Sequence, residues 1–176
     1  MRPIVAPLPL DIESGLAGEV DAWLADRAVV RPEFPLVWAP HGGAVWHDVA
    51  VEGIEQLAAL VSALDAQTFG ILRSADPSIG RWGQTMHGPD LWIVEVHDGS
   101  AADFAQRAHR GGPGGYPAGG HRGDGALDIE SFRPVEVALI LWAWMHGGLP
   151  TGYARTLRHL SDGYRRRYGL LEDDGS

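Results

Sequence analysis

Eight histidines are the residues of this chain best suited to bind a metal ion or transfer a proton. Their spacing contains no H-x-H, H-E-x-x-H or H-x-x-E-H pattern, the arrangements that bring two ligands to one metal ion. His41 and His47-Asp48 lie on either side of a predicted loop–strand junction, without a third ligand near them in the sequence. We therefore expect no metal site and no cofactor, and we interpret the histidines as structural or surface residues.

Nucleophilic catalysis also lacks its motif. The triplet His41-Gly42-Gly43 is similar to the oxyanion loop of lipase-type hydrolases, but such an enzyme needs a serine in a G-x-S-x-G turn. None of the eight serines has that context. The glycine-rich stretch 110–125 contains neither of the standard phosphate-binding patterns. We therefore predict no catalytic residue, and a protein that is not an enzyme.

Carboxylates are the remaining group of chemical interest. Glu95, Asp98 and Asp103 gather near the end of a predicted strand, and Asp124 and Asp128 border the end of the glycine-rich stretch. Paired carboxylates can act as general acid and base, although solvated surface carboxylates explain such a cluster more often. Both readings stay open at this point.

The overall charge indicates what these carboxylates can attract. The chain has 23 acidic and 14 basic residues, a formal net charge of −9 and a pI of about 5.2. Such a field repels nucleic acid and anionic membranes and favours cationic partners. The Arg165-Arg166-Arg167 run is interpreted as balancing a local acidic surface. We expect no nucleic-acid or membrane binding.

The element that must organise the domain is a helix at 134–147. From Val135 to His146 it carries one formal charge, Glu136, among aliphatic and tryptophan side chains. The pattern predicts burial on most sides, with only Glu136, Ala143 and part of Ile140 turned toward water. About 14 residues span roughly 21 Å, too short to cross a bilayer.

Helix 53–65 shows one apolar stripe at helical spacing. Three strands should follow it, joined by short turns that contain Pro and Asp; they are predicted at 67–73, 79–86 and 91–97. We predict a single α+β domain in which an antiparallel meander packs against two or three helices.

Residues 1–43 are predicted to form an irregular arm that belongs to the same domain, with a short helix after Ser14 and a loop over 31–43. The α+β core is expected at 44–170. Within it we predict a strand at 44–51, a mobile loop at 110–125, a brief strand at 127–130, and a second helix or irregular segment after Gly152.

The chain has 176 residues and no cysteine, which excludes disulfides and thiolate chemistry. Its start does not show a cationic region followed by an apolar run, and we expect a cytoplasmic location.

The order of these elements resembles the α+β immunity proteins of bacterial polymorphic toxin systems, over residues 50–150. It looks most like their first numbered family, whose members end in a Pro/Glu/Ala helix followed by a Gly-x-Pro stop. The matching residues of this chain are Pro134, Glu136, Ala138, Trp144, Gly148 and Pro150.

The resemblance implies a protein that binds and blocks a cognate toxin domain, often a nuclease or a deaminase. A cover for a basic cleft needs acidic groups and apolar anchors. The expected partner-binding residues are Glu95 and Asp98, then Asp103, Asp124 and Asp128, with Trp82 or Trp92 as anchor.

Two other classes stay open. One is a small-molecule enzyme or ligand-binding protein with a pocket under the 110–125 loop, lined by Trp82, Trp92 and histidines. The other is a structural or adaptor protein in a larger assembly.

Overall fold

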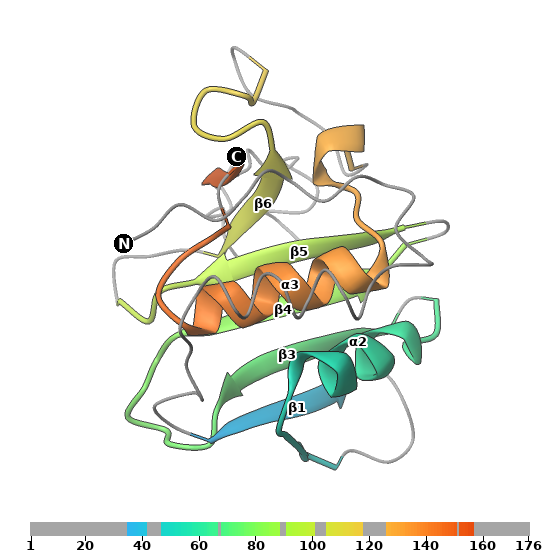
Figure 1. The fold of residues 1–176 in the computed structure, drawn as a ribbon, viewed down its shortest axis with the longest axis vertical. Coiled ribbons are helices and arrows are strands. Elements are labelled where there is room, and N and C mark those ends of the chain that lie inside the picture. The colour runs from blue at the N-terminus through green and yellow to red at the C-terminus, as the bar shows by residue number, and fades with distance from the viewer. Residues whose placement is uncertain are drawn as a thin grey trace, which may run out of the picture.

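The computed structural model describes residues 35–41, 47–66, 68–88, 91–100, 105–117, 126–150 and 152–156. They form a single α+β domain, which confirms the predicted fold class (Figure 1). The sheet has seven strands in the order β2-β1-β3-β4-β5-β6-β7, and every neighbouring pair is antiparallel. No helix among these residues has the length and apolar character needed to cross a membrane.

The elements follow one another along the chain with these bounds: β1 (Leu36–His41), β2 (Val49–Val51), α2 (Ile54–Ser62), β3 (Phe69–Ser74), β4 (Trp82–His87), β5 (Trp92–His97), β6 (Gln106–Arg110), the 3-10 turn η1 (Asp128–Glu130), α3 (Pro134–Met145) and β7 (Tyr153–Thr156). The meander β3-β4-β5 and the helices α2 and α3 correspond to the five elements predicted from periodicity. The helix α2 connects β2 to β3, which lie on either side of β1.

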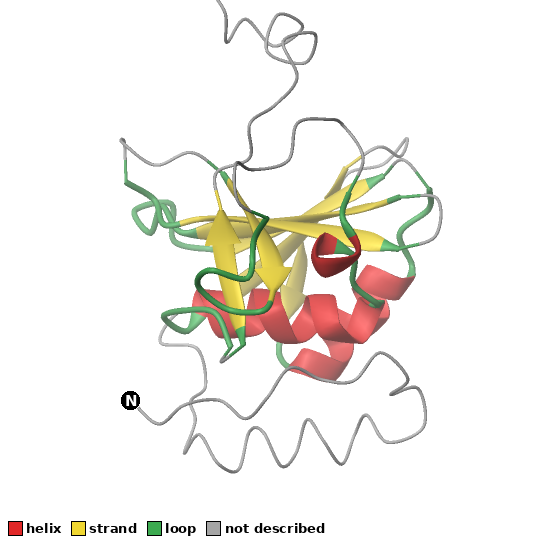
Figure 2. Cartoon of the chain, turned by 90° about the horizontal axis from the view of Figure 1, so that it is seen from above, coloured by secondary structure: helices red, strands yellow, loops and turns green. Residues whose placement is uncertain are grey.

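Both helices pack on the same face of the sheet, as Figure 2 shows. The core between the layers contains Leu72, Val94 and Val96 from the sheet and Leu57 and Val61 from α2, all fully buried. From Glu136 to Met145 every residue of α3 is buried, so this helix lies in the middle of the packing, in agreement with its near-continuous apolar sequence.

One expectation for α3 is wrong. Glu136, Ala143 and part of Ile140 were predicted to face water, and all three residues are buried. Glu136 can be buried because an arginine and a tyrosine bind its carboxylate, as described below. An apolar pattern cannot distinguish a solvated charge from one that is paired in the interior.

Several predicted segments differ from the structure. The predicted loop 31–43 contains β1, and the predicted strand 44–51 is a strand only at β2 among its described residues. Residues 128–130 form η1 in place of the strand predicted at 127–130. The segment after Gly152, predicted to be a helix or an irregular segment, begins with the strand β7. The strand β6 was not predicted. The expected helix after Ser14 lies outside the described residues.

The strands that were missed have a common physical cause. β1, with the sequence LVWAPH, contains a proline, and β6, with the sequence QRAHR, contains two arginines and a histidine. Neither has the alternation of apolar and polar residues that marks a half-buried strand. Their pairing with β3 and β5 stabilises them in the sheet, a tertiary effect that local propensity does not contain.

Two glycines let the layers approach closely. A Cβ atom on Gly70 would lie 2.0 Å from the buried Trp38 ring, and one on Gly83 would lie 2.6 Å from Leu141 on α3. A Cβ at Gly70 would therefore force the rigid, buried Trp38 ring to move, whereas one at Gly83 would meet the end of the flexible Leu141 side chain, which can shift at a lower cost.

We expect Gly70→Ala to destabilise the protein by about 1–3 kcal/mol, because Trp38 is fully buried and must leave its rotamer or shift the strand. Urea unfolding measures the effect. Gly148→Ala is the matched control, since a Cβ there meets nothing within 4 Å. Equal stability of the two variants would contradict the packing of Trp38 over β3.

Candidate functional site

The face of the sheet turned away from α2 and α3 carries the candidate site, and we call it the open face. Strand register and alternation place these side chains on it: Val37, Ala39, His41, Phe69, Ile71, Arg73, Trp82, Gln84, Met86, Ile93, Glu95 and His97. Within the described part of the chain, no helix covers this face (Figure 2). Most of the face is half-buried.

An apolar row crosses one end of the open face. It consists of His41, Phe69, Met86 and Ile93, which are successive register partners on β1, β3, β4 and β5. The His41 ring stacks on Phe69 with centroids 4.6 Å apart. Met86 is 43% exposed, the most exposed large apolar side chain among the described residues. Burial lowers the pKa of His41, against the opposing effect of Asp48, so its ring is neutral near pH 7.

A polar row lies beside it, in the middle of the strands. Gln84 donates a hydrogen bond to Glu95 over 2.7 Å, and Arg107 of β6 forms an ion pair with Glu95 over 2.9 Å. Both carboxylate oxygens of Glu95 therefore have donors within the protein, and the guanidinium neutralises its charge. Glu95 was predicted as a partner contact, but its charge is already compensated at this position.

The opposite end of the open face is formed by Trp82 and His97, whose rings are stacked with centroids 5.2 Å apart. Asp98 follows directly. Its carboxylate accepts a hydrogen bond from the Ser100 N–H and lies 3.4 Å from Arg155. These contacts, chiefly those of Ser100, lower the pKa of Asp98 to about 2.

The structure brings only some of the predicted binding residues together. Trp82 and Glu95 share the open face on the neighbouring strands β4 and β5. Asp98 follows β5, and its carboxylate lies near Arg155, whose guanidinium packs over Trp144 of α3 on the helix-covered side. Trp92 lies on the helix-covered face, where it stacks on His87 and packs against the core. Asp128 is an exposed residue of η1. Asp103 and Asp124 lie outside the described residues.

This placement also bears on the small-molecule pocket. Trp82 and Trp92 occupy opposite faces of the sheet and opposite ends of the β4–β5 pair. They cannot line a single pocket. Among the described residues, no three His, Asp or Glu side chains are grouped as a metal ion would need.

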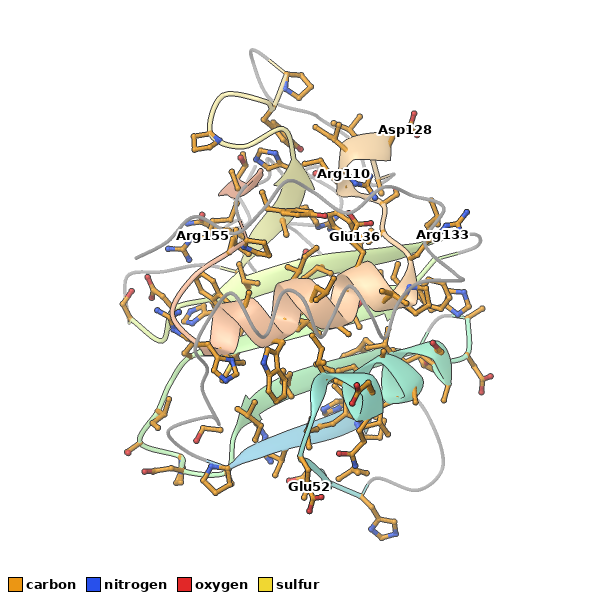
Figure 3. All side chains as sticks on the ribbon, viewed as in Figure 1. Glu52, Arg110, Asp128, Arg133, Glu136 and Arg155 are labelled. Carbon is orange, nitrogen blue, oxygen red and sulfur yellow. The ribbon has the colours of Figure 1, made fainter. Side chains whose placement is uncertain are left out.

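A buried ion pair lies at the side of the domain that contains β6. Arg110 binds both oxygens of Glu136, over 2.8 and 2.6 Å, and Tyr153 of β7 also donates to this carboxylate. The other guanidinium hydrogens reach the backbone oxygens of Asp128 and Ser131, each over 2.9 Å. Figure 3 shows Arg110 and Glu136 side by side between β6 and α3.

A second buried carboxylate holds the chain that follows β6. Glu130 is fully buried and accepts hydrogen bonds from the Tyr116 hydroxyl and the Leu127 N–H. It also lies 3.9 Å from Arg107, the partner of Glu95. Tyr116 belongs to the glycine-rich stretch 110–125, which was predicted to be a mobile loop. The hydrogen bond from Tyr116 to Glu130 anchors the first half of this stretch to the domain.

The sequence reasoning missed both buried pairs. One signal was available: a lone glutamate in an otherwise apolar helix must find a buried cation or face water. The sequence QRAHR offers arginines at alternate faces of a strand, Arg107 toward the open face and Arg110 toward the helices. Which arginine pairs with Glu136 could be known only from the sheet order.

Together these observations define the class of protein: an α+β domain with one helix-covered and one open sheet face, and with buried ion pairs at β6. Comparisons with protein-family models, curated proteins and solved structures find no match to this chain.

We expect Arg110→Ala to cost about 3–5 kcal/mol, because it leaves Glu136 buried without its cation. Arg73→Ala is the matched control. Arg73 pairs with Asp48 at the surface, where such pairs contribute about 0–1 kcal/mol. Chemical denaturation compares the two. Similar losses would show that burial does not determine the strength of the Arg110 pair.

The Asp98 carboxyl should titrate near pH 2 in a carbon-detected NMR experiment. Because the folded-state pKa is lowered, the stability contributed by this group is present above its unfolded value, 3.8, and is lost as pH falls toward 2. Ser100→Ala should raise the midpoint part of the way to 3.8, since the backbone N–H remains. Asp76, which has its own serine at 78, should be unaffected. A titration of Asp98 unchanged by Ser100→Ala would exclude the hydroxyl as a cause.

Proposed function

We propose that this protein is an immunity protein, which binds a basic toxin domain through the open face and thereby blocks the toxin. The observation that carries the proposal is the apolar row with its exposed Met86. Protein interfaces are typically centred on a few apolar or aromatic side chains surrounded by polar groups, and the open face has this composition.

The charge of the chain supports a cationic partner. With a net charge of −9, the protein attracts a basic domain over a long range and increases the rate of encounter. A nuclease or deaminase toxin has a basic cleft for its nucleic-acid substrate, and an acidic cover competes directly with that substrate.

The resemblance to immunity proteins supports this function over a generic binding role. The helix that carries the resemblance is α3, and its Glu136 is the buried partner of Arg110. In this proposal α3 has a structural role, and binding belongs to the opposite face of the sheet.

The test is co-expression with a toxin domain encoded by a neighbouring gene. Cells that produce the toxin domain should survive when the wild-type protein is present. Ile71→Arg, in the middle of the open face, should abolish protection because it adds a cation where the basic partner docks.

Ala59→Arg is the matched control, since Ala59 is exposed on α2 and faces away from the sheet. This variant carries the same charge change and should protect fully. Circular dichroism of both variants confirms folding. Cell death with the wild-type protein, for each neighbouring toxin-like domain, would refute the immunity function. Protection by Ile71→Arg would move the binding site away from the open face.

A further inference from the structure

The side of α3 that points away from the sheet is buried, although no described element lies over it. Leu141 points toward the sheet, where it meets Gly83 of β4. Leu139 and Ala143 lie two positions before and after Leu141, a turn of about 200° around the helix, and so point the opposite way. These two residues are nevertheless only 6% and 1% exposed. In a domain of two layers, a helix exposes this side to solvent.

The described neighbours of α3 account for its other sides. The strands β3, β4 and β5 lie beneath it, and α2 packs beside it (Figure 1). Arg110 of β6 and Tyr153 of β7 bind its Glu136. Figure 2 shows α2 and α3 on one side of the sheet, with no other described helix or strand beyond α3. The structure contains a single chain, so a partner molecule does not account for the burial of Leu139 and Ala143.

Only one of the segments outside the described residues has a sequence suited to cover α3. The internal segments have at most eight residues, and the longest, 118–125, contains no apolar side chain larger than alanine. In 157–176, Gly163 and Gly169 interrupt the chain, so no run after β7 exceeds six residues. By contrast, residues 19–30 form a run of twelve without glycine or proline, and α3 also has twelve residues.

We propose that residues 14–30 form a helix that packs against Leu139 and Ala143 on the outer side of α3. The contact is made by an apolar stripe at helical spacing, which consists of Leu16, Val20, Trp23 and Leu24. Ser14 is a residue type that caps a helix N-terminus. The small Ala143 side chain leaves space for a large ring such as that of Trp23, as facing layers of a core require.

The connection to β1 is long enough for this position. An extended chain from Val30 to Leu36 spans up to about 20 Å. Leu36 is buried at the start of β1, and a helix layer is about 10 Å thick, so the chain can pass from the outer side of α3 to the sheet.

The docked segment adds a third layer on the side of the domain opposite the open face. It explains why α3 has no charged residue from Val137 to Met145, since a helix between two layers is apolar on both sides. The segment uses no residue of the open face. Its docking is therefore independent of the function proposed above.

Thiol labelling tests the proposal in the full chain, which has no cysteine of its own. The thiol introduced by Ala143→Cys should be protected from a maleimide reagent in the folded protein. A second change, Trp23→Asp, should raise the labelling rate about ten-fold or more, because a carboxylate is not tolerated in an apolar contact. Leu160→Asp, the matched change beyond β7, should leave the rate within about two-fold. Circular dichroism and melting temperatures establish that the variants fold.

Photo-crosslinking keeps the proposal testable if Trp23→Asp does not fold. A benzophenone amino acid at position 23 retains the aromatic bulk and, on irradiation, bonds to the groups that it contacts. Mass spectrometry should locate the cross-link in α3. The same amino acid at position 164 is the control and should not cross-link to α3.

Three results would overturn the proposal. Rapid labelling of Ala143→Cys in the folded chain would show that the outer side of α3 is accessible. A thiol that stays protected in a folded Trp23→Asp variant would assign the cover to another segment, and release by Leu160→Asp would identify that segment as 157–176. Cross-links from position 23 that lead only to the strands, or to no part of the domain, would exclude the contact with α3.

Discussion

The bidentate ion pair between Arg110 and Glu136 is the contact on which the β6 side of the domain depends. Arg110 belongs to β6, Glu136 to the first turn of α3, and the same guanidinium also binds the backbone of η1 and its C-terminal neighbour. Tyr153 adds β7 to the group. The ion pair thus joins four elements: the guanidinium links β6 to α3 and η1, and the carboxylate adds β7. A lysine, with a single charged atom, could not reproduce this geometry.

The pair also explains why the sheet can extend past β5. Register pairing between β5 and β6 covers only Glu95–Arg107 and Val96–Gln106. At the start of β5, the bridge partner of Trp92 is Phe132. The segment from η1 to Phe132 therefore fills the space where the two strands separate. On the open-face side of this segment, the buried Glu130 is paired with Arg107, which also binds Glu95. On the helix side, Arg110 is paired with Glu136. This segment therefore covers the core beside α3 where no strand is paired with the start of β5.

Local patterns were sufficient for the elements that bury one apolar side: α2, α3 and the meander β3-β4-β5 follow from periodicity and turn residues. They were insufficient for β1, β6 and β7, whose pairing depends on neighbours distant in the sequence. For the candidate site, the sequence placed Glu95 and Asp98 near the end of one predicted strand, and they lie in β5 and directly after it. The compensation of Glu95 by Arg107, the burial of Trp92 and the exposure of Met86 all depend on which face of the sheet each residue occupies. A single sequence does not specify which face of the sheet a residue occupies until the strand order and register are known.

The short outer strands of the described sheet affect how readily two molecules can associate edge to edge. The strands β2 and β7 contain three and four residues, respectively. A short edge offers few backbone groups to the edge of another molecule, which limits sheet-to-sheet aggregation. The described edges of the sheet are therefore poor templates for strand addition by another chain.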